Sequence, residues 1–180
     1  MKVLILNGSP RHSGNTRSAL QVMKAELEKE HTVEFLDVCN LHLSGCVACD
    51  GCKKNGGHCV RPDDSDQVIQ KVVAADVVLF GTPVYWWGMS AQLKMLVDKF
   101  YSQDGPFKTM PKTIGLLTVG ANGVDNPQYR LIREQFQCIA EYLHWKFAFS
   151  LEFSAYAPGE LMEQPQTLEQ LQKACGLLVK

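Results

Sequence analysis

Two kinds of hydrophobic pattern alternate strictly along this 180-residue sequence. Short apolar runs rich in Val, Ile, Leu and Phe predict strands, and longer segments with apolar residues every three or four positions predict helices. The predicted strands cover residues 2–9, 31–38, 76–85, 113–121 and 146–153. The predicted helices cover residues 16–30, 63–73, 90–101, 128–145 and 168–179. Such alternation requires crossover connections, and therefore a parallel sheet with helices on both faces.

The burial expected of each strand indicates its place in the sheet. The segments VLIL, VVLF and IGLL are almost continuously apolar, as strands covered on both faces must be, whereas TVEFLDV is mixed and suits an edge. Five strands of this kind favour an α/β fold, a flavodoxin-like three-layer sandwich with a parallel sheet of order 2-1-3-4-5. We find no internal repeat or linker, so we predict a single domain over residues 1–180 with a Cys-rich loop at about 44–62.

Charge and hydropathy exclude several classes of partner. Eighteen basic and nineteen acidic residues leave a net charge of -1 without a basic arm, so no nucleic-acid footprint is visible. The apolar run before Asn7 is too short for a secretory signal, and there is no apolar run of membrane-spanning length. We therefore expect a cytoplasmic protein that binds no membrane. Thiols stay reduced in that compartment, so clustered cysteines indicate metal or redox chemistry more than disulfides.

The loop after the first strand, NGSPRHSGNTRS, has the composition of an anion site. Backbone N–H groups, hydroxyls and a helix N-terminus can converge there on a phosphate, and Arg11 adds a positive charge. His12 could also contact the anion. A G-x-G-x-x-G motif and a Walker lysine are both absent, so a single terminal phosphate fits better than a dinucleotide or a nucleoside triphosphate. The alternative is an ordinary polar loop before a capped helix.

Two further loops follow strands at the same predicted sheet edge. GTPVYWWGMS, residues 81–90, places Tyr85, Trp86 and Trp87 where a planar ring could be covered, although such aromatics are more often core or oligomer contacts. Trp86 and Trp87 would point in opposite directions if the strand continued, so at least one should pack away from a ligand. The loop TVGANGVDNPQ adds small residues whose N–H groups could face a ring edge.

At these motifs the sequence resembles a known family. GSPRHSGNT together with TPVYWWGMSAQLKMLVDKF is similar to the flavin mononucleotide (FMN) reductases of the flavodoxin-like superfamily, and CVACDGCKKNGGHCVRPDD resembles their iron-sulfur flavoprotein branch. The resemblance spans residues 3 to about 123 and implies bound FMN. It places the phosphate against Ser9, Arg11, Ser13, Asn15 and Thr16. It places the ring against Pro83, Val84, Tyr85, Trp86 and Gly88, with Thr118 to Gly120 closing the other side. Lys99 departs from the arginine common in the family, which leaves a structural role for Asp98 with residue 99 in doubt.

Four cysteines are spaced C-x2-C-x2-C-x6-C at Cys46, Cys49, Cys52 and Cys59. This spacing suits a [4Fe-4S] cluster better than zinc, which usually takes two C-x2-C pairs farther apart, although Cys46, Cys49, Cys59 and His58 could bind zinc. A further alternative is that the loop binds no cluster, as in family members that lack some of these cysteines. Because the loop follows the second strand, we expect it near the same sheet edge as FMN. Cys39, Cys138 and Cys175 are expected in the core, and His31, His42 and His144 at the surface.

These patterns together predict an FMN-dependent oxidoreductase in which the cofactor performs the chemistry and no side chain is a catalytic acid or base. With a cluster, a ferredoxin-like protein is the expected electron donor; without one, NAD(P)H would reduce FMN for a quinone, metal or free-flavin acceptor. The alternatives are a passive flavodoxin-like carrier, which the net charge disfavours, and a zinc-bound interaction module. The resemblance also implies a homodimer or homotetramer, for which the aromatic side chains of Trp87, Phe100, Tyr101 and Phe107 are candidate contacts.

Overall fold

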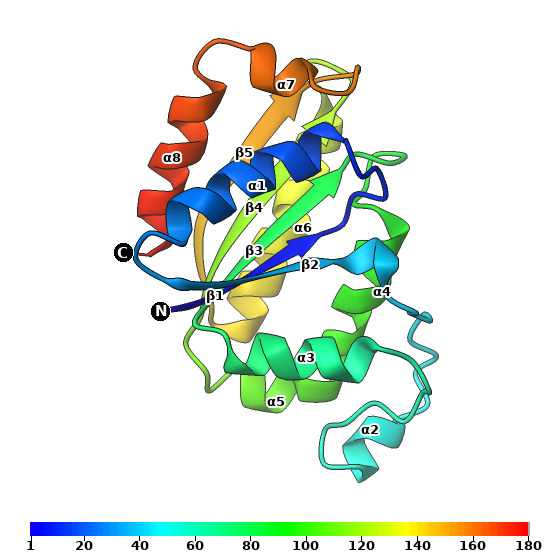
Figure 1. The fold of residues 1–180 in the computed structure, drawn as a ribbon. Coiled ribbons are helices and arrows are strands. Elements are labelled where there is room, and N and C mark those ends of the chain that lie inside the picture. Colours follow the sequence, from blue (N-terminus) through cyan, green and yellow to red (C-terminus); the bar gives the residue numbers. More distant parts are fainter. Residues whose placement is uncertain (180) are drawn as a thin grey trace.

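A computed structural model describes residues 1–179 and contains one five-stranded parallel sheet of order β2-β1-β3-β4-β5 (Figure 1). This order confirms the predicted flavodoxin-like arrangement. The strands are β1 (Lys2–Asn7), β2 (Thr32–Asp37), β3 (Val77–Pro83), β4 (Thr113–Gly120) and β5 (Lys146–Ser154). The main helices are α1 (Asn15–Leu27), α3 (Ser65–Ala74), α4 (Ala91–Asp98), α6 (Pro127–Leu143) and α8 (Thr167–Leu178). Short helical segments are η1 (Val38–Asn40), α2 (Gly51–Lys54), η2 (Lys99–Gln103), α5 (Asp104–Phe107) and α7 (Glu160–Glu163).

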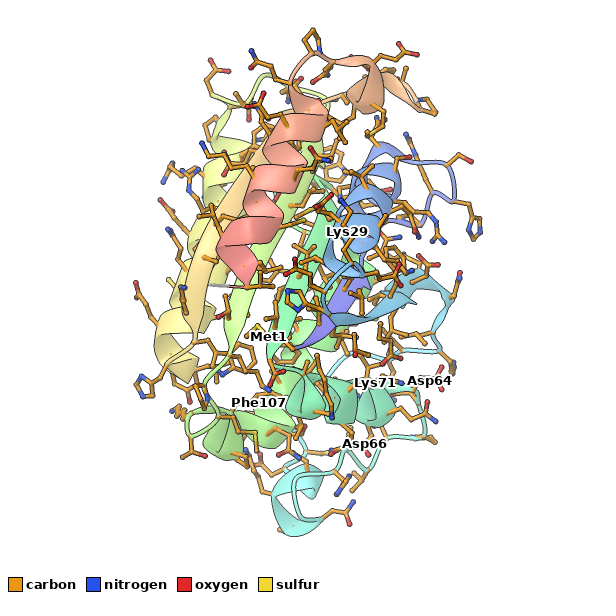
Figure 2. The ribbon with its side chains drawn as sticks, turned by 60° about the vertical axis from the view of Figure 1, so that its left-hand side comes forward. Met1, Lys29, Asp64, Asp66, Lys71 and Phe107 are labelled. Atoms are coloured by element: carbon orange, nitrogen blue, oxygen red, sulfur yellow. The ribbon has the colours of Figure 1, made fainter. Side chains whose placement is uncertain are left out.

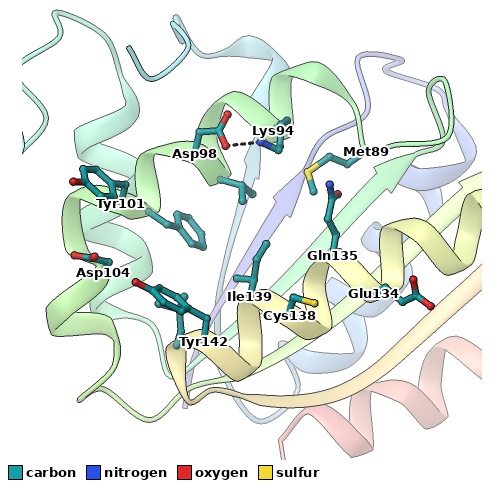
Figure 3. Close-up of a pocket in the computed structure, with 13 residues that line it drawn as sticks. Met89, Lys94, Asp98, Tyr101, Asp104, Glu134, Gln135, Cys138, Ile139 and Tyr142 are labelled. Carbon is teal, nitrogen blue, oxygen red and sulfur yellow. Dashed lines mark hydrogen bonds and ion pairs between the residues drawn. The ribbon is translucent and has the colours of Figure 1, made fainter. Parts of the chain in front are cut away.

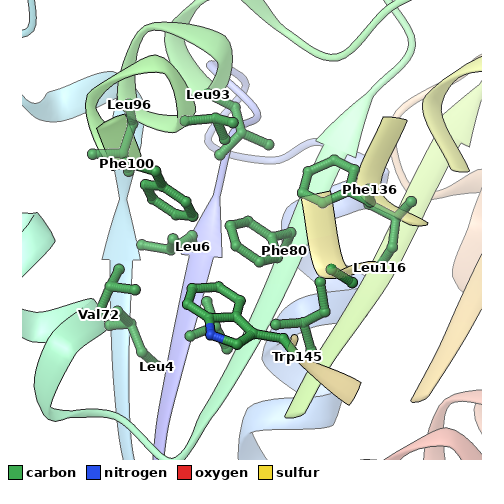
Figure 4. Close-up of a cluster of buried hydrophobic side chains, with 14 of the residues drawn as sticks. Leu4, Leu6, Val72, Phe80, Leu93, Leu96, Phe100, Leu116, Phe136 and Trp145 are labelled. Atoms are coloured by element: carbon green, nitrogen blue, oxygen red, sulfur yellow. The ribbon is translucent and has the colours of Figure 1, made fainter. Parts of the chain in front are cut away.

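The sheet is buried on both faces because successive side chains of its central strands point to opposite sides. Val3 and Ile5 belong to the core under α1 and α8, whereas Leu4 and Leu6 belong to the core under α3, α4 and α6. In the second core the Phe80 and Phe136 rings lie 4.8 Å apart between centroids (Figure 4). All four strand pairs are parallel, so the carboxyl ends of the five strands meet at one edge of the sheet.

Several boundaries differ from the sequence prediction. The third strand ends at Pro83 because Tyr85 to Gly88 form a tight turn. The helix predicted over 90–101 becomes α4 followed by the 3-10 segment η2. The segment 44–62 projects beyond α3 and α5 and includes only the short helix α2 (Figure 1). No helix within residues 1–179 is long and apolar enough to cross a membrane.

Some predicted environments are also corrected. Cys175 is buried, as expected, and burial raises the pKa of its thiol to about 12. Cys138 is exposed instead, because the buried stripe of α6 runs through Ile132, Phe136 and Ala140 and leaves position 138 outside it. Two further corrections concern Phe100 and Phe107, which are core residues and not candidate contacts, and His31, which is half-buried. Cys39 is half-buried, while His42 and His144 are exposed as expected.

Candidate functional site

The loops that leave β1, β3, β4 and β5 enclose a cavity of about 140 Å³ at the carboxyl edge of the sheet. We call it the edge cavity. Its lining comprises Ser9, Arg11, Gly14, Asn15, Thr16, Pro83, Val84, Tyr85, Val119, Gly120, Ala121, Ala155 and Tyr156. Four of the five residues predicted to hold a phosphate, and Pro83, Val84, Tyr85 and Gly120 from the predicted ring site, therefore share one cavity. Ser13, Trp86, Gly88 and Thr118 do not line it.

The β1–α1 loop is held in shape by its own polar groups. The Ser9 N–H donates to Asn7 Oδ1 at 3.1 Å, and the Arg11 N–H donates to Ser9 Oγ at 3.3 Å. Gly14 is the N-cap residue of α1, and no side chain caps the helix. The first N–H groups of a 13-residue helix are thus left without a side-chain cap at the cavity, where the helix dipole favours an anion.

Of the two arginines near this loop, Arg17 has an acidic partner and Arg11 has none within residues 1–179. Arg17 donates to Asp37, which also accepts from Asn7 Nδ2 at 2.8 Å. Burial alone would raise the pKa of Asp37, but the hydrogen bonds from Arg17 and Asn7 outweigh it and hold that pKa below its ordinary value. Arg11 is exposed, lines the cavity and forms no ion pair with any side chain of residues 1–179. Arg11 is therefore the cation available to an anionic ligand.

The side chain of Asn15 is not free for a ligand. Its Nδ2 donates to the Ala157 carbonyl at 2.8 Å, and its Oδ1 accepts from the Leu161 N–H at 3.3 Å. Sequence reasoning assigned no role to this C-terminal segment, which also contributes Ala155 and Tyr156 to the cavity. The sequence could have indicated this contribution, because the segment directly follows the fifth strand and so begins at the same sheet edge. With its side chain engaged in this way, Asn15 offers an anion its backbone N–H in the first turn of α1.

On the opposite side of the cavity, Gly120 is packed so closely that a side chain would not fit. A Cβ at this position would lie 2.8 Å from Val84 Cγ2, from Tyr129 Oη and from Gln128 Nε2. The Gln128 Nε2 atom and the Thr118 Oγ1 atom are buried without a hydrogen-bond partner in the described residues. The end of β4 therefore combines a closely packed glycine with unused polar atoms, which is compatible with a polar ligand edge.

The aromatic loop, Tyr85 to Gly88, forms a tight turn whose backbone conformation is one that tryptophan rarely adopts. Tyr85 and Gly88 exchange two backbone hydrogen bonds of 2.9 and 3.0 Å, and Trp86 and Trp87 both have positive φ, 46° and 61°. Positive φ at both central positions is typical of type I′ turns, which prefer Asn-Gly. Trp86 is 92% exposed and Trp87 51%, so Tyr85 alone of the three aromatics lines the cavity.

The four clustered cysteines line one small cavity, which we call the cysteine cavity. Positive φ values at Ala48 and Asp50 turn the backbone between the first three cysteines. Cys46 and Cys49 are exposed, and Cys52 and Cys59 are half-buried. Within residues 1–179 no group of three or more His, Cys, Asp or Glu side chains is arranged to hold a metal ion. The donor set fits an iron-sulfur cluster by type and by shared cavity, although the thiols do not converge.

Polar contacts fasten this loop to η2 and α3. The Gln103 Nε2 donates to the Gly57 carbonyl at 3.0 Å, and Tyr101 Oη donates to Asp50 Oδ1 at 2.8 Å. Asp66, which Figure 2 labels near the start of α3, accepts from the Cys59 N–H at 3.1 Å. These contacts lie at the carboxyl end of α4, whereas the aromatic turn precedes its amino end. The expectation that the loop lies at the FMN edge is thus wrong: the two cavities share no lining residue.

A third and larger cavity, about 650 Å³, lies between α4, η2 and α6. We call it the helix groove. Figure 3 shows Tyr101 and Asp104 at one side and Ile139 and Tyr142 at the other. Asp98 pairs with Lys94 across one turn of α4, whereas Lys99 pairs with Asp63. A structural pair between Asp98 and residue 99, which the sequence left in doubt, is therefore not observed in the described residues.

Comparisons with known proteins agree with this geometry. Residues 1–144 match the family described as NADPH-dependent FMN reductase. An iron-sulfur flavoprotein of Methanocaldococcus jannaschii is 37% identical over 123 residues, which cover 68% of this chain and 63% of that protein. A putative NAD(P)H-dependent FMN-containing oxidoreductase of Bacillus subtilis, YwqN, is 26% identical over 177 residues and 93% of each chain. An NAD(P)H:quinone oxidoreductase from Methanothermobacter marburgensis has the same fold, with a TM-score of 0.73 at 17% identity over 97% of this chain and 94% of that one.

The sheet order and the cavity at its carboxyl edge define a flavodoxin-like α/β protein. The chain belongs to the NADPH-dependent FMN reductase family, and its relatives include several proteins named iron-sulfur flavoproteins. The resemblance seen in the sequence motifs is confirmed. The matched region spans 63%, 50% and 48% of the length of three of those iron-sulfur flavoproteins.

The turn at Trp86 and Trp87 gives a prediction about stability. Replacing Trp87 with glycine should raise the free energy of unfolding by about 1 kcal/mol, because glycine adopts positive φ without the strain of a side chain. Urea denaturation followed by circular dichroism measures the change. Trp87→Val is the matched variant: a β-branched residue at the same φ should lower the stability. A stabilising valine or a destabilising glycine would contradict the assigned backbone strain.

Proposed function

We propose that the protein is an FMN-dependent oxidoreductase that passes electrons from a reduced donor to an acceptor. The observation that supports it best is the composition of the edge cavity. An uncapped helix N-terminus and an unpaired arginine lie at one part of its lining, and Pro83, Val84 and Tyr85 lie at another. FMN has a phosphate at one end and a flat heterocycle at the other, and the cavity offers groups suited to each.

In this proposal the phosphate binds at Ser9, Arg11, Ser13, Asn15 and Thr16, with Asn15 contributing its backbone N–H. The ring lies against Pro83, Val84, Tyr85, Trp86 and Gly88, and the segment from Thr118 to Gly120 closes the other side. The edge cavity fits FMN by its donors, because the N–H groups at the start of α1 have no side-chain cap and Arg11 lines the same cavity.

When bound, FMN supplies hydride and single-electron chemistry. The chain binds it, orients it and provides positive charge at the phosphate. No histidine, carboxylate, lysine or cysteine side chain, the usual acid-base groups of enzymes, is among the described residues that line the edge cavity. Hydride transfer from NAD(P)H requires no such group. Steady-state oxidation of NADPH or NADH with a quinone, metal or free-flavin acceptor tests the activity, and its complete absence would favour a passive carrier.

Arg11→Met tests the phosphate site directly. Loss of one charge-assisted hydrogen bond, on the order of 1.5 kcal/mol, should weaken FMN binding about tenfold. Fluorescence quenching of the titrated flavin measures the affinity. Riboflavin, which has the same ring and no phosphate, is the control ligand, and its affinity should not change. Equal weakening of both ligands would place Arg11 away from the phosphate.

We also propose that the cysteine cavity holds a [4Fe-4S] cluster with Cys46, Cys49, Cys52 and Cys59 as ligands, and that a ferredoxin-like protein then serves as the electron donor. Four thiols in one cavity and relatives named iron-sulfur flavoproteins support this. The exposed and non-converging thiols of Cys46 and Cys49 favour the alternative, a cluster-free NAD(P)H-dependent FMN or quinone reductase. In either form the proposed site of action is the reducing cytoplasm.

Iron and labile sulfide decide between these forms. Anaerobic reconstitution should yield about four of each per chain if the cluster is bound. Cys52→Ala should lose most of both, because it removes a ligand inside the cavity. Cys138→Ala is the control, since that exposed cysteine lies on α6, outside the loop. A sample with flavin absorbance alone and no labile sulfide would exclude the cluster and support the cluster-free reductase.

We propose further that two copies associate through the helix groove as a homodimer, or as part of a homotetramer. Tyr101 and Tyr142 are exposed beside this large apolar hollow, and a second copy would cover them. Tyr142→Glu should lower the mass measured by light scattering to that of a monomer. Leu168→Glu, a similar change at an exposed apolar residue of α8, should leave the assembly intact. An unchanged mass for Tyr142→Glu would exclude this face.

A further inference from the structure

The segment that follows β5 forms one wall of the edge cavity. Ala155 and Tyr156 line this wall, and Figure 1 shows the next helix, α7, near the amino end of α1. Ala155 is buried, whereas Tyr156 is 78% exposed. Within residues 1–179 the hydroxyl of Tyr156 makes no hydrogen bond and its ring has no aromatic partner. The side chain of Tyr156 is therefore available to a molecule in the cavity.

The backbone on both sides of Tyr156 is held by hydrogen bonds. The Ala155 N–H donates to the Gly120 carbonyl at 2.8 Å, which extends the pairing of β5 with β4. The N–H groups of Tyr156 and Ala157 both donate to Glu160 Oε2, at 2.7 and 2.8 Å. Loop backbones are usually more mobile than the elements that they connect. Here an exposed side chain has a fixed attachment point, which a residue that selects a ligand needs.

The course of this segment indicates which end of the cavity Tyr156 occupies. The residue before it is bonded to the end of β4, and the residue after it, Ala157, accepts a hydrogen bond from Asn15 Nδ2 at 2.8 Å. Asn15 is the first residue of α1, and the N–H groups at this helix terminus are the proposed phosphate site. Tyr156 is thus adjacent in sequence to the residue that meets the start of α1, at the phosphate end of the proposed site.

We propose that Tyr156 is a specificity-determining residue that closes the edge cavity beyond the phosphate. It would select a flavin that ends in a single phosphate over flavin adenine dinucleotide (FAD), which continues through a pyrophosphate. This inference rests on the proposed FMN site. A terminal phosphate needs no space beyond the anion loop, whereas the second phosphate and the nucleoside of FAD must pass this end of the cavity. The Tyr156 ring acts by obstructing the longer ligand, and obstruction of a competitor is a common source of specificity.

The test measures the affinity of the full-length chain, freed of bound flavin, for FMN, FAD and riboflavin by fluorescence quenching. Wild-type protein should bind FMN more tightly than FAD. Tyr156→Ala should lower this preference, the ratio of the FAD Kd to the FMN Kd, about tenfold, equivalent to about 1.4 kcal/mol. The affinity for riboflavin should not change, because riboflavin has no phosphate and does not reach this end of the cavity.

Further variants separate the ring from the backbone that positions it. Tyr156→Phe keeps the ring and should keep the wild-type preference. Glu160→Ala removes the acceptor of two N–H groups and should lower the preference, whereas Glu160→Gln keeps an acceptor oxygen and should retain it. Met162→Ala changes an exposed side chain of α7 that does not line the cavity, so it is the control and should leave all three affinities unchanged. Circular dichroism reports whether each variant is folded.

The outcomes distinguish this inference from the proposed function. If wild-type protein binds neither FMN nor riboflavin, the proposed flavin site is wrong and the inference fails with it. If the wild type binds FMN but Tyr156→Ala leaves the preference over FAD unchanged, Tyr156 does not select the ligand, although the flavin site stands. Equal weakening of all three flavins by Tyr156→Ala would place this side chain against the flavin ring and would also overturn the inference.

Discussion

The burial of the sheet on both faces is the constraint on which the rest of the structure depends. It requires near-continuous apolar sequence in β1, β3 and β4, and the helices in the connections between the parallel strands provide the cover. Parallel strands then end together, so four loops meet at one edge. The loops are free to be polar and irregular because they contribute little to the core. The candidate site is therefore a consequence of the packing that stabilises the sheet.

Much of this arrangement could be predicted from the sequence, because it depends on local patterns. Apolar runs indicated the strands, the flavodoxin-like pattern indicated their order, and the family resemblance of the loop motifs indicated the residues that share the edge cavity. What could not be predicted depends on contacts between distant segments. The bonds from Asn15 to Ala157 and Leu161 join residues 142 and 146 positions apart, and the pair of Asp63 with Lys99 joins residues 36 positions apart. The spacing of apolar residues along a sequence does not predict such long-range contacts.

Other predictions were wrong where the chain departs from the usual relation between local sequence and backbone structure. Continuing β3 to Tyr85 was reasonable on composition, but two tryptophans at positive φ end the strand in a tight turn. A loop rich in glycine and cysteine was placed at the sheet edge, whereas polar contacts hold it at the far end of α4. Strained turns and buried charges of this kind cost stability, and proteins keep them mostly where function requires them. Both features lie beside proposed cofactor sites.

The hydrogen bonds of Asn15 connect two parts of the chain that the family match treats separately. Residues 145–180 lie outside the matched family region, yet Ala157 and Leu161 bond directly to a residue of the anion loop, which lies inside it. The segment after β5 is thereby coupled to the start of α1. A change at Ala157 or Leu161 would reach the edge cavity through Asn15, although neither residue lines that cavity.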